Sequence, residues 1–92
     1  MSDDNDTNIL LDIDLSILGE NPMKYKEYCE NIRKEYQIYP DFIYRKGRQK
    51  VLENILKLDS IYKTEFFKQE YESQAKENLT LELNQLNNGI LE

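Results

Sequence analysis

Apolar side chains recur at intervals of three and four residues along most of the chain, and this spacing is typical of helices that pack through one face. We expect four helices, over residues 8–19, 22–37, 42–58 and from Thr64 to about Asn88. The face of the last helix is the most regular and comprises Phe67, Tyr71, Ala75, Leu79, Leu83 and Leu86. No segment has the alternation expected of a strand. The sequence therefore predicts an all-α fold of about four helices.

Residues that commonly begin or end helices mark the boundaries. Asn21 followed by Pro22 predicts an N-cap with proline at the first helical position. Asp41 and Thr64 are the expected caps of the third and fourth helices, and Gly19 is the expected end of the first.

One glycine lies where a helix former would be expected. Gly47 interrupts the third predicted helix, where a glycine costs about 1 kcal/mol relative to alanine. We expect a neighbouring element to pack closely against it.

A length of 92 residues predicts one domain, or part of one, with a modest core. We divide the chain into an acidic, disordered start (1–8), a helical domain (9–88) and a short tail (89–92).

The charge balance bears on possible partners. Eighteen acidic residues against twelve lysines and arginines give a net charge of −6, which argues against nucleic acid and anionic membranes as general partners. The acidic N-terminus does not resemble a secretory signal, and the longest apolar run is too short to cross a bilayer. We therefore expect a cytoplasmic protein.

Six cations nevertheless lie between residues 33 and 50. Arg45 and Arg48 are three residues apart and so share a helix face, and with Arg33 they could bind a phosphate. The favoured alternative is ion pairing with Glu35 or Asp41.

The lack of histidine limits the possible chemistry. Cys29 is the single cysteine, and the chain contains no histidine at all. A Cys–His nucleophile, a Ser–His–Asp triad and a histidine-containing metal site are therefore excluded within this chain.

The stretch NILLDIDLSILG places Asp12 and Asp14 in an apolar run, where a buried carboxylate needs a partner or a metal. On a continuous helix Asp14 would point inward and Asp12 would lie about 160° away, at the rim. This follows because Asp14 is three or four residues from Leu10, Leu11, Ile17 and Leu18. The simpler alternative is that both aspartates face water or form ion pairs with basic side chains.

An apolar run followed by Asp-x-Asp also resembles the opening motif of haloacid-dehalogenase-type phosphatases, in which Asp12 would be the nucleophile. That fold needs further βα units to complete its parallel sheet. The chain has only helical patterns after residue 20, which disfavours this relationship.

A series of motifs over residues 9–86 resembles a different family. LLDIDLSILG is followed in order by YKEYCENIRKEY, a Pro-Asp pair, YRKGRQKVLENIL, IYKTEFF and ESQAKENLTLEL. The order and spacing are similar to the C-terminal half of the predicted metal-dependent phosphohydrolases of the HD superfamily.

The resemblance implies an all-helical fold and a divalent metal (Mn, Mg or Zn) that activates water for attack on a phosphate ester. In that family a histidine, a His-Asp pair and a later aspartate hold the metal. Carried over, the later ligand is Asp14, with Asp12 as second choice. The histidines belong to an N-terminal half that this sequence does not contain.

Two functions are therefore expected. The chain is a truncated HD-superfamily phosphohydrolase-like protein that is inactive alone, either a degenerate product or one completed by a chain that supplies the N-terminal half. Alternatively, it is a helical interaction module that self-associates or complements a partner chain.

Overall fold

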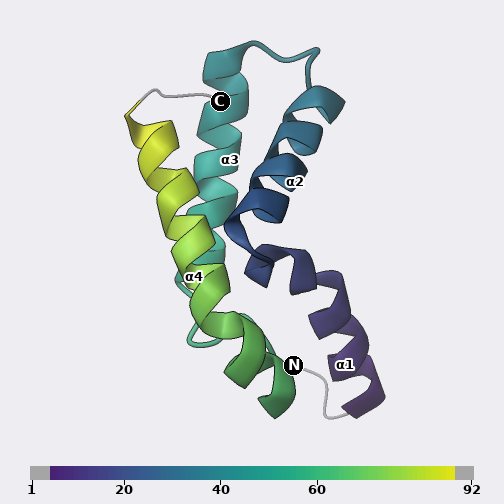
Figure 1. The fold of residues 1–92 in the computed structure, drawn as a ribbon. Coiled ribbons are helices and arrows are strands. Elements are labelled where there is room, and N and C mark those ends of the chain that lie inside the picture. Colours follow the sequence, from purple (N-terminus) through teal and green to yellow (C-terminus); the bar gives the residue numbers. More distant parts are fainter. Residues whose placement is uncertain (1–4, 89–92) are drawn as a thin grey trace.

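The computed structural model describes residues 5–88, which are helical apart from short connections and contain no strand (Figure 1). The elements are α1 (Asn5–Asp14), a 3₁₀ helix η1 (Ser16–Gly19), α2 (Pro22–Glu35), α3 (Asp41–Leu56) and α4 (Glu65–Asn87). The predicted all-α class with about four helices is confirmed. Residues 1–4 of the acidic start and the tail 89–92 lie outside the described residues.

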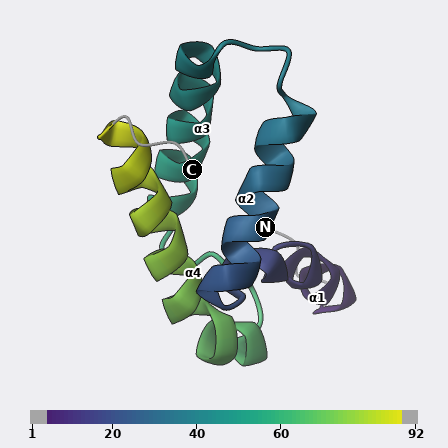
Figure 2. The same cartoon turned by 45° about the horizontal axis from the view of Figure 1, so that its top comes forward.

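The molecule is elongated, with extents of 40 × 21 × 21 Å. Helix α4 packs against η1 and α3. Helices α2 and α3 are joined by a loop at one end, and α1 lies at the opposite end, where it projects beyond the other helices (Figures 1 and 2). The main packing contacts of α1 are with η1.

The core draws its apolar side chains from every element except α1, and among residues 6–14 of that helix the buried side chain is the carboxylate of Asp12. Buried apolar side chains come from η1, α2, α3, α4 and the connector before α4: Leu18, Tyr25, Leu52, Ile61, Tyr62, Ala75, Leu79 and Leu86. The predicted face of α4 is confirmed, since its remaining members Phe67, Tyr71 and Leu83 pack against this core.

The first predicted helix is divided in two. Helix α1 starts at Asn5, inside the segment predicted to be disordered, and ends at Asp14. The Ser16 hydroxyl donates to the Ile13 carbonyl oxygen at 2.7 Å, and the Leu18 amide bonds to the Leu15 carbonyl three residues back. These local hydrogen bonds replace the α-helical pattern with a tighter turn.

Two of the predicted caps differ in detail. Asn21 accepts a hydrogen bond from the Lys24 amide at 3.0 Å, as predicted for an N-cap. Asp41 is the first residue of α3 instead of its cap, which is Pro40. Thr64 occupies the N-cap position of α4, but its side chain accepts no hydrogen bond from that helix.

Gly19 and Gly47 differ in how closely other residues approach them. A Cβ at Gly19 would lie 2.7 Å from the Tyr71 carbonyl oxygen and 2.9 Å from the Tyr71 Cβ, so η1 approaches α4 as closely as glycine allows. A Cβ at Gly47 would have no described atom outside its own helix segment within 4 Å. The predicted close packing against Gly47 is therefore wrong for residues 5–88.

Candidate functional site

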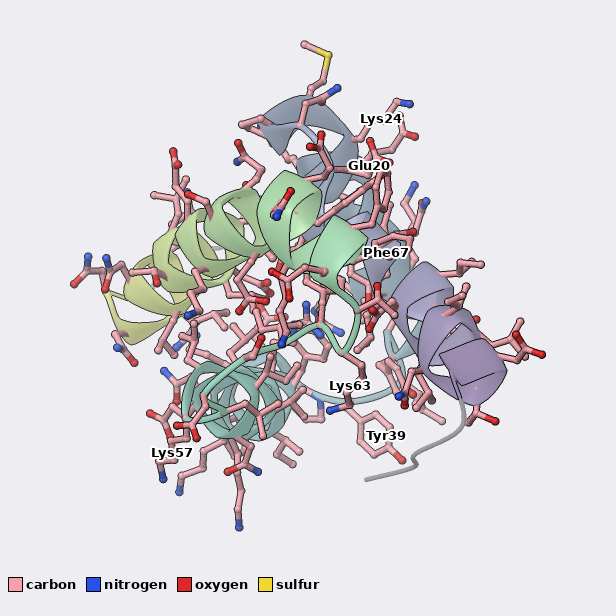
Figure 3. The ribbon with its side chains drawn as sticks, turned by 90° about the horizontal axis from the view of Figure 1, so that it is seen from below. Glu20, Lys24, Tyr39, Lys57, Lys63 and Phe67 are labelled. Atoms are coloured by element: carbon pink, nitrogen blue, oxygen red, sulfur yellow. The ribbon has the colours of Figure 1, made fainter. Side chains whose placement is uncertain are left out.

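Asp12 is fully buried and holds the start of α4. Its Oδ1 accepts from the Lys63 amide at 2.7 Å, and its Oδ2 accepts from the Thr64 amide and the Thr64 hydroxyl, both at 2.7 Å. Figure 3 shows this end of the molecule, where the connector carrying Lys63 leads to the first turn of α4 with Phe67. Lys63 and Thr64 immediately precede Glu65, the first residue of α4, so the carboxylate lies at the positive end of that helix, where a negative charge is favoured. Asp12 thus caps α4 from another helix.

The predicted orientation of the two aspartates is wrong. Asp12 is buried, whereas Asp14 is exposed. The helical periodicity that placed Asp14 beside Ile17 and Leu18 requires one continuous helix, but α1 ends at Asp14. The neighbours three and four residues later consequently belong to η1 and no longer share a face with it.

The surroundings of Asp12 do not fit a divalent metal. The groups aimed at its oxygens are N–H and O–H donors, which compete with a cation for the carboxylate. Across residues 5–88, no three histidine, cysteine, aspartate or glutamate side chains gather closely enough to hold a metal ion. Metal ligation by Asp14 or Asp12 stays a prediction. It would need further ligands from outside residues 5–88.

A second polar cluster joins three helices around Glu82 of α4. Arg48 of α3 donates from Nε to Oε2 at 2.7 Å and from Nη2 to Oε1 at 3.0 Å. The Tyr25 hydroxyl and the Cys29 thiol of α2 also donate to Oε1, the thiol at 3.4 Å. The Arg48 and Glu82 side chains are only 10% and 11% exposed, so the pair is largely desolvated.

The raised pKa values in this cluster keep Cys29, Tyr25 and Arg48 protonated at neutral pH. Burial and then the negative charge of Glu82 raise the pKa of the Cys29 thiol to about 12. Burial, again reinforced by Glu82, raises the pKa of the Tyr25 hydroxyl above its ordinary value. Burial alone would lower the pKa of Arg48, but its hydrogen bonds and ion pair with Glu82 outweigh that effect and raise it. Cys29 therefore stays a protonated thiol and is a poor nucleophile.

The three arginines do not converge on a common phosphate site. Arg33 pairs with Asp41 at 2.5 Å and donates to the Tyr36 and Tyr39 carbonyl oxygens, so it holds the α2–α3 loop. This agrees with the ion pairing favoured from the sequence. Arg48 is occupied by Glu82. The buried Nε of Arg45 has no hydrogen-bond partner among the described residues.

Sequence reasoning missed Glu82, although a signal was present. Glu82 lies three residues after Leu79, so it falls next to the apolar face of α4. An acid at such a position needs a buried cation.

Two hollows flank α2. A cavity of about 330 Å³ between α2 and α4 is lined partly by the cluster around Glu82. A larger hollow of about 680 Å³, here called the α2–α3 groove, is lined mainly by aromatic and aliphatic side chains, with Glu35, Asn31, Arg48 and Gly47 among them. Its apolar lining residues are Tyr28, Ile32, Tyr36, Tyr39, Ile43, Tyr44 and Val51.

Comparison with family models, curated proteins and solved structures finds no match to this chain. None of the helices in the described part has the length and apolarity to cross a membrane.

Proposed function

We propose that this chain is a helical interaction module whose apolar surface is covered by association with another chain. The observation that carries this proposal is the outer face of α1. Leu10 and Ile13 are 63% and 51% exposed there, while the inner face of the same helix is closed off by Asp12. A stable amphipathic helix normally buries its apolar side chains, and a contiguous exposed apolar surface marks an interaction site.

The polar interior supports binding over catalysis. Asp12 is saturated by the start of α4, and Glu82 by donors from α2 and α3. The half-buried thiol of Cys29 has a raised pKa, so it lacks the thiolate that nucleophilic catalysis requires. These groups stabilise the fold and leave binding to its surface.

The test is the molar mass in solution, measured by light scattering from about 5 to 500 µM. We expect the mass of the full chain to rise with concentration, and the double variant Leu10→Ser/Ile13→Ser to remain monomeric. Met23→Ser is the matched control, because Met23 is 82% exposed but lies on α2. Equal masses for the wild-type chain and the α1 double variant at every concentration would contradict the proposal.

The relationship to HD-superfamily phosphohydrolases is a second proposal, which the ordered series of motifs over residues 9–86 supports. In this proposal the module corresponds to the later helices of such a domain and does not hydrolyse phosphate esters alone. A divalent metal would require a chain that supplies histidines. We expect calorimetry with Mn²⁺ or Zn²⁺ to show no binding to the isolated chain. Binding that disappears in Asp14→Ala or Asp12→Ala would instead demonstrate a metal site formed here.

A further inference from the structure

The α2–α3 groove is an apolar surface that the chain itself does not fill. Helices α2 and α3 are farthest apart at the loop that joins them and approach each other toward their other ends (Figures 1 and 2). The groove's side chains Tyr36, Tyr39, Ile43 and Val51 are each between 46% and 50% exposed. Such a half-exposed apolar groove between two helices has the form of a site that accepts a third helix.

Gly47 leaves one position in the α3 wall of the groove without a side chain. It lies in the interior of α3, lines the groove and has no described atom near the position of a Cβ. A helix-interior glycine costs about 1 kcal/mol, and no contact within residues 5–88 offsets that cost. A glycine does, however, let another backbone approach closely. Its position is explained if a partner helix packs against this part of α3.

Helix α1 of a second copy has the matching character. Asp6, Leu10, Ile13 and Asp14 are all exposed and follow the spacing i, i+4, i+7, i+8, so they form one face with apolar centre and acidic ends. On α3, Lys46 and Lys50 lie beside Ile43, Gly47 and Val51 at helical spacing. The charged side chains that line the groove itself are Glu35 of α2 and Arg48 of α3, so Lys46 and Lys50 would meet the acidic ends of α1 at the groove's edge.

The dimensions also agree. Ten residues of α1 extend about 15 Å, and the wall from Ile43 to Val51 extends about 12 Å, at 1.5 Å per residue. Because α1 and the α2–α3 loop lie at opposite ends of the molecule (Figure 1), two antiparallel copies can each place α1 in the other's groove. Such a twofold-symmetric dimer leaves no groove open for a third copy, and it buries the apolar surface of α1 and of the groove in both copies.

We propose that the chain forms a reciprocal dimer in which α1 of each copy occupies the α2–α3 groove of the other. This deepens, and rests on, the proposed role as an interaction module: it names both the occupant and the receiving site.

The first experiment fills the groove with Gly47→Leu. A Cβ at Gly47 would have no described atom outside its own helix segment within 4 Å, and leucine is a better helix former than glycine, so the diluted variant should be at least as stable as the wild-type chain in urea. We expect its dimer dissociation constant to rise at least tenfold by analytical ultracentrifugation. Gln69→Leu, which adds the same side chain at an exposed position of α4, should dimerise like the wild-type chain.

A mixing experiment tests reciprocity. Gly47→Leu retains an intact α1, and Leu10→Ser/Ile13→Ser retains an intact groove. Each variant alone should be monomeric, whereas their mixture should form a heterodimer through the one remaining α1–groove contact. A charge exchange adds a second criterion: Asp14→Lys and Lys50→Glu should each weaken dimerisation, and the two variants mixed should regain affinity.

The outcomes separate this inference from the proposal on which it rests. Dimerisation that requires Leu10 and Ile13 but is unaffected by Gly47→Leu would overturn the groove assignment and leave the interaction module intact. Dimerisation that is indifferent to all these variants would overturn both. A wild-type chain that stays monomeric at about 500 µM would overturn the reciprocal dimer.

Discussion

A single carboxylate at residue 12 satisfies the start of a helix more than fifty residues away. Asp12 accepts hydrogen bonds from the Lys63 and Thr64 amides, which have no helical acceptor of their own. Its negative charge also lies at the positive end of α4. Asp14, two residues further on, is exposed at the end of α1 and has no comparable role.

Replacing Asp12 should therefore be far more damaging than replacing Asp14. We expect Asp12→Ala to lower the free energy of unfolding by about 2–3 kcal/mol, because it leaves buried amides without an acceptor. Asp14→Ala should change it by less than about 0.5 kcal/mol. Urea denaturation followed by circular dichroism measures both, and similar losses for the two variants would contradict the capping role.

The Cys29 thiol predicts a loss of stability in alkali. Its pKa is raised from 9.0 to about 12 in the folded chain, so the unfolded chain loses this proton first. Stability is then fully present below about pH 9 and declines as the pH rises toward 12. Urea midpoints should fall between pH 9 and 11, and the fall should be shallower for Cys29→Ala. Tyr25, Tyr44 and Tyr62, whose pKa values burial also raises, contribute to the remaining slope. Equal slopes in both proteins would contradict this assignment.

At the scale of elements, close approach and ion pairing hold the helices together. Gly19 brings η1 against the backbone of Tyr71, while Arg48 and Glu82 connect α3 to α4. The Asn78 amide of α4 donates to the Leu18 and Glu20 carbonyl oxygens at 2.9 and 2.8 Å, so the end of η1 is fixed by hydrogen bonds as well as by packing.

The two glycines should respond in opposite directions to alanine. Gly19→Ala forces a methyl group toward the Tyr71 carbonyl, and because backbone cannot rotate away as a side chain can, we expect a loss of about 1–3 kcal/mol. Gly47→Ala meets open space and should stabilise the monomer by up to about 1 kcal/mol. Thermal unfolding at low concentration compares them, and a destabilising Gly47→Ala would show that the surroundings of Gly47 are not open.

The elements could be predicted from the sequence where local chemistry determines them. The cap at Asn21 and the apolar face of α4 depend on residues a few positions apart, and both are present in the structure. The orientation of Asp12 could not be predicted, because it depends on where α1 ends and on a connector fifty residues later. The partner of Arg48 was missed for the same reason: Glu82 is 34 residues away.

At the scale of the whole molecule, much apolar surface lies outside the core. The exposed large apolar side chains include members of α1 and of the α2–α3 groove, at opposite ends of the fold. A domain of this size has little stability to spare, so covering these surfaces contributes a substantial fraction of the total.

The melting temperature should consequently depend on protein concentration. Association stabilises the folded chain only, so we expect the midpoint to rise by about 5 °C or more between about 5 and 500 µM. The midpoint of Leu10→Ser/Ile13→Ser should stay constant over the same range. Parallel behaviour of the two proteins in differential scanning calorimetry would show that α1 does not mediate association.

The hydrogen bonds of Asp12 can form only after residues 63 and 64 have been translated. Residues 63 and 64, which receive its carboxylate, are translated about fifty residues after it, an interval of about 3–10 s at typical elongation rates. Throughout that time η1 lacks α4, the helix against which it packs, and Asp12 of α1 lacks its hydrogen-bond donors. The segment from α1 to η1 is therefore made early and completes its packing and hydrogen bonds late.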